Sequence, residues 1–302
     1  MRRQNDSARE TEFFTNTPQN GSDALRLLFA GGCHVGGFPA GEEFGFVRRA
    51  VARLDRQWPQ RRFRAETLLH VSLASAQRIA AACRACRPQV LVLQLGHYES
   101  SLPLAKRLAR LLRGRAAQRN RPPRDVSSWK ANYEPNPTLR FHESWRHRLK
   151  SAVKLALDGL LRLAGHPAFD SARLERQLAE MLELLRAQGV PQIVVLSPFP
   201  VCDRTIARYR RQLHRMMAQQ AARQGCHFVD LAGVAAGQAP DEFFADDRHL
   251  GRAGHRAVGR LVADAIGELW ATAAPAVSAA VPAALAVPRL ERASSRVPAL
   301  QV

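Results

Sequence analysis

Short apolar runs alternate with longer amphipathic stretches along the chain, and this alternation predicts the order of strands and helices. Five short runs are candidate strands, and the third of them, 89–95 (QVLVLQL), is almost continuously apolar, as strands buried on both faces of a sheet tend to be. We expect these strands at 25–30, 66–73, 89–95, 192–196 and 228–231. Apolar residues at helical spacing predict helices at 42–56, 75–87, 171–188, 203–223 and 252–272.

Strands that alternate with helices predict an α/β fold with a mostly parallel five-stranded sheet and helices on both faces, a three-layer α/β/α sandwich. We expect one domain at 25–272, interrupted by an insert at 101–166. The polar arm 1–24 has no apolar core like that of a secretory signal, and the tail 273–302 is rich in Ala and Pro. Both ends are therefore expected to be disordered.

Charge and cysteine content bound the compartment and the partners. The formal net charge is +19, and the insert alone carries fifteen Lys or Arg against four acidic residues. No helix-turn-helix, zinc-finger or RNP-like pattern accompanies this charge, so we expect no nucleic-acid partner. Five scattered cysteines do not form a disulfide framework, and no stretch has the composition of a spanning helix. We therefore expect a soluble, cytoplasmic protein.

The insert contains a basic amphipathic helix at 145–163, whose apolar positions 145, 149, 153, 156, 160 and 163 form one stripe. The favoured interpretation is a helix that packs on the protein's own body and leaves its basic face in solvent. A lid over the sheet edge and a helix lying on an anionic membrane surface are alternatives. Contact of the insert with an anionic surface therefore stays open.

Reactive side chains follow the predicted strands in three segments. They are 31–37 (GGCHVGG), 96–99 (GHYE) and 246–250 (DDRHL). Because ligands bind beyond the carboxyl ends of parallel strands, we expect these segments to meet at one sheet edge.

The order and spacing of these segments resemble the SGNH/GDSL hydrolase family. In that family the first strand ends in Gly-Asp-Ser, the third in Gly-x-Asn-Asp, and Asp-x-x-His precedes the last helix. Asp246-x-x-His249 matches the last motif, and the resemblance spans roughly 25–100 and 170–272. It implies an SGNH-hydrolase-like, flavodoxin-like fold and the hydrolysis of an ester or related acyl bond in a small-molecule or acylated substrate.

The resemblance also implies a role for individual residues. Cys33 takes the place of the family's Ser nucleophile, His249 acts as the base, and Asp246 orients His249. The backbone N–H groups of Cys33 and Ala74 would bind the oxyanion, and Tyr98, in the Asn position, would be a third donor. No metal ion or organic cofactor is implied.

Other interpretations of these residues remain open. Cys33 can equally be a small residue in a tight turn, and the replaced Ser and Asn favour a catalytically degenerate binding module. Cys83-x-x-Cys86 lies within a helical pattern and is interpreted as two incidental cysteines, and His255 is expected to pack at the start of the last helix. The acyl and alcohol groups of the substrate and the oligomeric state stay open.

Overall fold

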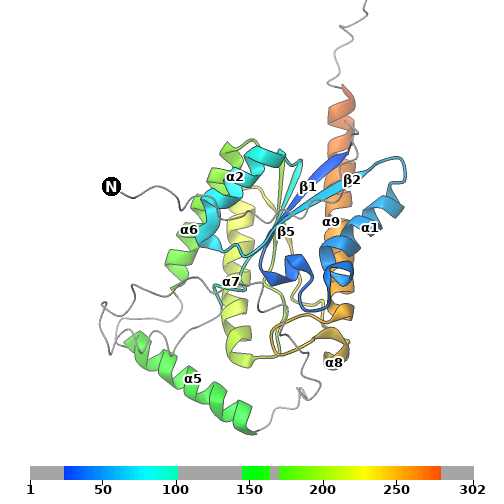
Figure 1. The fold of residues 1–302 in the computed structure, drawn as a ribbon. Coiled ribbons are helices and arrows are strands. Elements are labelled where there is room, and N and C mark those ends of the chain that lie inside the picture. The colour runs from blue at the N-terminus through cyan, green and yellow to red at the C-terminus, as the bar shows by residue number, and fades with distance from the viewer. Residues whose placement is uncertain (1–23, 101–144, 164–169, 280–302) are drawn as a thin grey trace, which may run out of the picture.

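A five-stranded parallel sheet forms the centre of the protein (Figure 1). The computed structural model describes residues 24–100, 145–163 and 170–279. Across the sheet the strands follow the order β2-β1-β3-β4-β5. The strands are β1 (Leu25–Gly31), β2 (Phe63–Leu68), β3 (Val90–Gln94), β4 (Gln192–Leu196) and β5 (His227–Val229). This topology confirms the predicted parallel α/β sheet.

Helices cover both faces of the sheet, which confirms the predicted three layers (Figure 1). One layer holds α1 (Phe46–Gln57) and α9 (Arg252–Ala279). The other layer holds α2 (Ala76–Cys86), α6 (Ser171–Ala187) and α7 (Arg204–Arg223).

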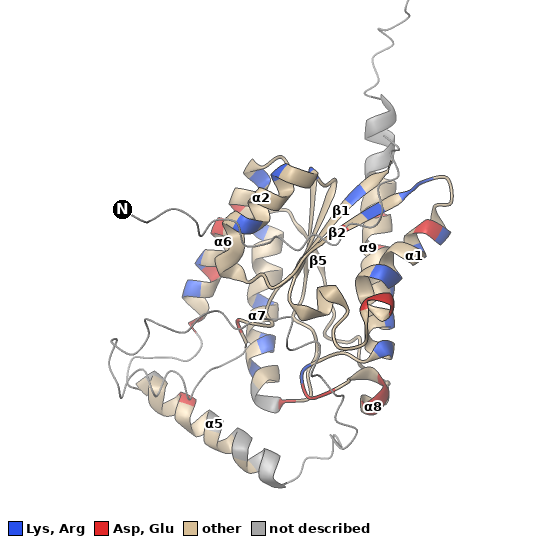
Figure 2. Ribbon diagram, viewed as in Figure 1, with Lys and Arg blue, Asp and Glu red and all other residues tan. Residues whose placement is uncertain are grey.

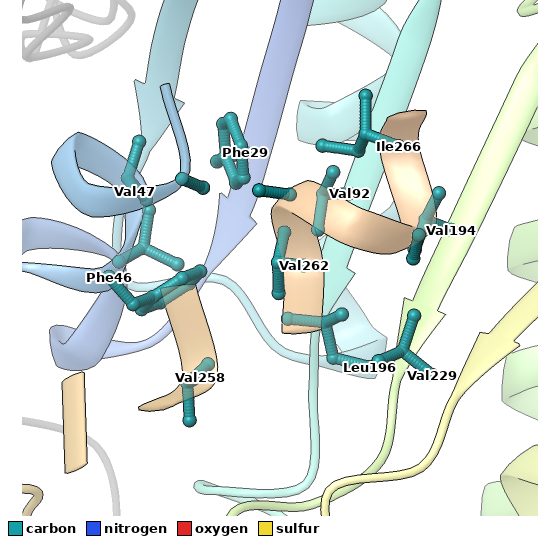
Figure 3. Close-up of a cluster of buried hydrophobic side chains, with 14 of the residues drawn as sticks. Phe29, Phe46, Val47, Val92, Val194, Leu196, Val229, Val258, Val262 and Ile266 are labelled. Carbon is teal, nitrogen blue, oxygen red and sulfur yellow. The ribbon is translucent and has the colours of Figure 1, made fainter. Parts of the chain in front are cut away.

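Alternation along each strand divides the core into two halves. In β1, Leu27 and Phe29 face α1 and α9, whereas Leu28 and Ala30 face the opposite layer. Figure 3 shows the first half, in which Phe29 meets Phe46 of α1 edge to face at 6.2 Å between ring centroids. Burial of each such large side chain stabilises the fold by about 1.5–3 kcal/mol, so the continuously apolar strands hold both helical layers.

The order of the strands reverses between β1 and β3. β2 pairs with one side of β1, and β3 with β4 and β5 extends from the other side. In such sheets a crevice forms beyond the carboxyl ends of the two central strands. Two short 3-10 helices follow strands at this edge, η1 (Cys33–Gly36) after β1 and η3 (Leu73–Ser75) after β2. The remaining short elements are η2 (Glu42–Phe44) and α8 (Pro240–Phe243).

Several predicted boundaries differ from the structure, and the first helix, expected from 42, begins at Phe46. The second strand was expected at 66–73, but β2 ends at Leu68, and the Val71 N–H then donates to the Gly31 carbonyl at 3.1 Å. The last helix extends to Ala279 rather than ending at 272, because its last turns are rich in alanine, the strongest helix former. The predictions for 1–23, 280–302 and most of the insert lie outside the described residues.

The basic helix of the insert is α5 (Trp145–Leu163), with the predicted bounds, and it contacts α7. Its buried side is formed by Asp158 and Leu161. The predicted apolar stripe is exposed instead, with Leu160 63% and Leu163 87% accessible. The helix therefore lies against the protein's own body, as the favoured interpretation expects, but not through the described positions of the predicted stripe. Across the described part of the chain, no helix is long and apolar enough to span a membrane.

Positive charge is not confined to the insert. Figure 2 shows Lys and Arg on the outer surfaces of both helical layers.

Close packing of α9 on α1 yields a stability prediction. A Cβ at Gly259 would lie 2.7 Å from Arg49 Cβ and 2.9 Å from the Phe46 carbonyl oxygen. We expect Gly259→Ala to lower the free energy of unfolding by about 1–3 kcal/mol, because the helices would have to separate. At Gly267 the nearest atom is 3.7 Å away, so Gly267→Ala should raise it by up to about 1 kcal/mol. Urea unfolding measures both, and equal changes would contradict the packing argument.

Candidate active site

A tight turn after β1 places Cys33 at the sheet edge. The Gly32 N–H donates to Oε1 of the buried Gln94 at 2.8 Å, which ties the turn to the end of β3. A Cβ at Gly31 would lie 2.6 Å from Val35 Cγ2 and 2.7 Å from Gln94 Cβ. The turn therefore requires glycine at this position, and Cys33 follows as the first residue of η1.

The segment after β3 carries a carboxylate that joins two loops. Glu99 accepts from the Gly96 N–H and from the Leu73 N–H, each at 2.8 Å. It thereby links the end of β3 to η3, which contains Ala74. Tyr98 is 39% exposed, and its hydroxyl lies 3.0 Å from Nδ1 of His70.

The third segment holds a carboxylate–imidazole pair immediately before α9. Asp246 Oδ2 lies 2.7 Å from His249 Nδ1. The other oxygen, Oδ1, accepts from the Arg248 and His249 N–H groups, both at 2.7 Å. With both carboxylate oxygens engaged, Asp246 fixes the ring of His249 and directs its Nε2 away from the carboxylate.

Three imidazole rings surround the sulfur of Cys33. The ring centroids of His34, His97 and His249 are 5.3–5.5 Å apart. Cys33 Sγ lies 3.9 Å from His34 Nδ1 and 3.8 Å from His97 Nε2. His249 is close enough to Cys33 for the thiol to raise the pKa of the imidazole. The thiol thus contacts two rings, and the third ring packs beside those two.

The three rings differ in charge. Burial alone would lower the pKa of His249, but its hydrogen bonds with Asp246 and Cys33 raise that pKa to about 9. Burial, and then the nearby Arg210 cation, lower the pKa of His97 to about 3. Burial and the neighbouring histidines also lower the pKa of His34. Near neutral pH, His249 is therefore protonated and positively charged, whereas His34 and His97 are neutral.

Cys33, His34 and His97 have the ligand types and proximity of a transition-metal site, with donor atoms within 4.8 Å of one another. The hydrogen bonds oppose this use. His34 Nε2 accepts from the Leu250 N–H at 3.3 Å, and His97 Nδ1 lies 3.2 Å from a nitrogen of Arg210, which can only donate. In both neutral rings the proton is therefore on the nitrogen that faces Sγ. The trio presents N–H groups to the sulfur, and a metal ion would have to reverse both hydrogen bonds.

Asp246 and His249 form a hydrogen-bonded pair, and Cys33 lies at the same sheet edge, so their catalytic roles stay a prediction. Ala74 and Tyr98 lie on loops of the same edge, with the Tyr98 hydroxyl turned to His70. Other residues of this edge have no role assigned by the sequence motifs, although three of them, His34, His97 and Glu99, lie in the predicted segments 31–37 and 96–99. These other residues are His34, His70, Gln94, His97, Glu99 and Arg210.

His70 has an unusual backbone conformation that its residue type does not indicate. Its φ is +56°, the left-handed region in which glycine is favoured, and it follows β2 closely. A histidine in the sequence gives no indication of this conformation.

The remaining cysteine pair and His255 have structural surroundings. Cys83 is buried, and Cys86 Sγ donates to the Ala82 carbonyl at 3.0 Å within α2. His255 is buried at the start of α9, where its Nδ1 accepts from the Phe46 N–H at 3.2 Å.

A family model described as the GDSL-like Lipase/Acylhydrolase family matches residues 40–257. The match begins after Cys33 and includes His97, Asp246 and His249. A search of the curated proteins gave no match.

Solved structures with a similar fold include two esterases. One is a catalytic mutant of Axe2, an acetylxylan esterase from Geobacillus stearothermophilus, 16% identical with a TM-score of 0.51, covering 81% of this chain and 95% of that one. The other is the psychrotrophic esterase EstA from Pseudoalteromonas sp., 12% identical with a TM-score of 0.50, covering 82% of this chain and 99% of that one. At these identities the similarity shows the shared fold.

The buried histidines predict how stability depends on pH. His97 and His255, with pKa values lowered to about 3 and 4, stay neutral in the folded chain, whereas the unfolded chain protonates them near 6.5. The free energy of unfolding should therefore fall as pH falls from 6.5 to 4, because the unfolded state binds more protons. His249, with its pKa raised to about 9, stabilises the fold below pH 6.5, and this contribution is lost as pH rises to 9.

Urea unfolding between pH 4 and 9 measures both limbs. We expect His255→Gln to make the free energy of unfolding fall less steeply between pH 6.5 and 4, because the contribution of one buried histidine is removed. The Gln side chain can still accept a hydrogen bond from the Phe46 N–H, so the fold should be retained. The same acid slope in the wild type and in His255→Gln would contradict the assignment.

Proposed function

Because the chain belongs to the GDSL-like lipase/acylhydrolase family, we propose that it hydrolyses an ester or related acyl bond through Cys33, His249 and Asp246. The family acts on ester bonds, and the identity of the three residues is our proposal. One observation supports it: His249 Nδ1 lies 2.7 Å from Asp246 Oδ2, and the His249 ring centroid lies 5.4–5.5 Å from those of His34 and His97, the two rings that contact Cys33 Sγ. A nucleophile, a base and a group that orients the base therefore follow one another in space.

Acylation begins when Cys33 Sγ attacks the carbonyl carbon of the ester. His249 Nε2 takes the thiol proton before the attack, which accounts for the protonated His249 ring, and Sγ attacks as a thiolate. The carbonyl oxygen then becomes an oxyanion in a tetrahedral intermediate. As this intermediate collapses, the C–O bond to the alcohol breaks and His249 returns the proton to the leaving oxygen. The acyl group is then held as a thioester on Cys33.

Deacylation follows the same path with water as the nucleophile. His249 removes a proton from water, the resulting hydroxide attacks the thioester carbonyl, and a second oxyanion forms. The C–S bond breaks, the acid leaves, and the proton on His249 returns to sulfur. Asp246 keeps its hydrogen bond to Nδ1 throughout and stabilises the imidazolium in both steps.

Two backbone N–H groups are proposed to bind the oxyanion. Cys33 and Ala74 lie in the first turns of η1 and η3, where N–H groups have no acceptor within the helix. Tyr98 can be a third donor only if its hydroxyl turns away from His70.

Hydrolysis of p-nitrophenyl acetate and butyrate tests the triad. We expect Cys33→Ala, His249→Ala and Asp246→Asn each to lower kcat by roughly 10³–10⁴-fold, because each removes a group used in both steps. Cys226→Ala is the matched control, since Cys226 precedes β5 at the opposite end of the sheet. Iodoacetamide should abolish the rate of the wild type. Equal rates in all of these proteins would refute the triad and favour a binding module without catalysis.

A second candidate function is attachment of α5 to an anionic lipid surface. Exposure of its apolar stripe supports this, because Val153 is 59% and Leu160 63% accessible. Five Lys or Arg residues lie in the same helix and complement anionic headgroups.

Sedimentation with vesicles tests this attachment. The wild type should sediment with phosphatidylglycerol vesicles, less so as salt is raised, and not with phosphatidylcholine vesicles. Val153→Gln combined with Leu160→Gln should abolish sedimentation, whereas Leu261→Gln, at an exposed position of α9, should not. Equal binding of the double variant and the wild type would refute the role of α5.

A further inference from the structure

One imidazole beside the nucleophile is held in a single tautomer by a buried cation. His97 Nδ1 lies 3.2 Å from Nη2 of Arg210. A guanidinium has no acceptor, so Nδ1 must accept and the proton of the neutral ring is on Nε2. That nitrogen lies 3.8 Å from Cys33 Sγ. The side chain of His97 therefore directs an N–H group at the place where an acyl group would be bonded.

Arg210 is almost completely buried, at 5% exposed, and hydrogen bonds hold its side chain in place. Its Nε donates to Ser100 Oγ at 3.2 Å, and its Nη1 donates to the Phe199 carbonyl. Ser100 Oγ in turn donates to the Gly96 carbonyl at 2.6 Å. Within the described residues, no carboxylate forms an ion pair with Arg210. A buried cation without a carboxylate is costly, so the hydrogen bond to His97 is part of what keeps Arg210 satisfied.

The position that the family motif gives to an amide side chain holds a phenol. Tyr98 stands there, and its hydroxyl is 3.0 Å from His70. The preceding residue, His97, reaches Cys33 instead. His34 also directs an N–H at Sγ, but it is fully buried, whereas His97 is half-buried. A substrate oxygen that arrives from solvent therefore meets His97.

We propose that His97 is a catalytic residue, the side-chain N–H donor that binds the oxyanion, and that Arg210 is the positioning residue that keeps its proton on Nε2. The proposal rests on the proposed function, because the oxyanion forms when Cys33 attacks a carbonyl. In a tetrahedral adduct the oxygen and the sulfur are bonded to the same carbon, so a donor beside Sγ is within reach of the oxygen. Such a donor acts at about 3 Å and contributes roughly 100- to 1,000-fold to turnover.

An aldehyde separates oxyanion binding from thiol reactivity. Butanal adds to the thiol: the Sγ–C bond forms, the π bond of the carbonyl becomes a lone pair on the oxygen, the thiol proton stays on His249, and no oxidant is needed. The adduct has the tetrahedral oxygen but requires no leaving group, so its affinity is measurable without ester turnover. Alkylation of Cys33 by iodoacetamide forms no such oxygen, and its rate also reports that the fold around Cys33 is intact.

We expect His97→Ala to weaken butanal binding on the order of 100-fold and to lower kcat for p-nitrophenyl acetate by a similar factor, with KM nearly unchanged. His97→Gln, which restores a side-chain N–H, should recover part of both. The rate of alkylation should be retained in both variants. Unchanged butanal affinity in His97→Ala would overturn the proposal. A joint loss of butanal binding and alkylation would also overturn it, because His97 would then support the thiol itself.

The role of Arg210 has a spectroscopic readout. Imidazole ¹⁵N spectra should show the Nε2–H tautomer of His97 in the wild type and a mixture of tautomers in Arg210→Met, together with weaker butanal binding. Arg211→Met is the matched control, because Arg211 is the next residue of α7 and is exposed. The same single tautomer in Arg210→Met would overturn the positioning role.

The experiments distinguish failure of the proposed hydrolysis from failure of the proposed oxyanion donor. Butanal binding that depends on His97 without any ester turnover would refute hydrolysis and leave the oxyanion donor supported. Turnover that depends on Cys33 but not on His97 would do the reverse.

Discussion

The site depends on one hydrogen bond, from the Gly32 N–H to the side chain of Gln94. It crosses from β1 to β3 at the place where the strand order reverses. Gln94 is a buried polar residue at the end of an otherwise apolar strand, and leaving its acceptor unpaired would cost about 1–3 kcal/mol. Because this bond fixes the turn before Cys33 against the strand that precedes His97, nucleophile and donor share one frame.

Much of the fold could be predicted because the central strands β3 and β4 are apolar on both faces, which is the pattern of a sheet between two helical layers. The end of β2 could not. Leu69, Val71 and Leu73 continue the apolar pattern and are buried, but they pack as a loop beneath the sheet edge instead of pairing. Hydrophobicity reports burial, and it does not distinguish a buried loop from a strand.

The candidate site also contains residues that could be predicted from the sequence and residues that could not. Cys33, Asp246 and His249 could be predicted because motif spacing places them after strands. The pairing of His97 with Arg210 could not, because it joins residues 113 positions apart. In the sequence Arg210 also looks like its neighbour Arg211, although one is buried and the other is exposed. Which arginine of a helix enters the core is decided by tertiary packing, not by local pattern.

The buried cation of Arg210 restricts which substitutions the site can accept. Replacing His97 alone removes an acceptor from Arg210 and leaves a buried charge less well satisfied, and replacing Arg210 alone releases both Ser100 and His97. The hydrogen bonds of His97, Ser100 and Arg210 are therefore coupled, and a substitution at one of these positions changes the surroundings of the other two.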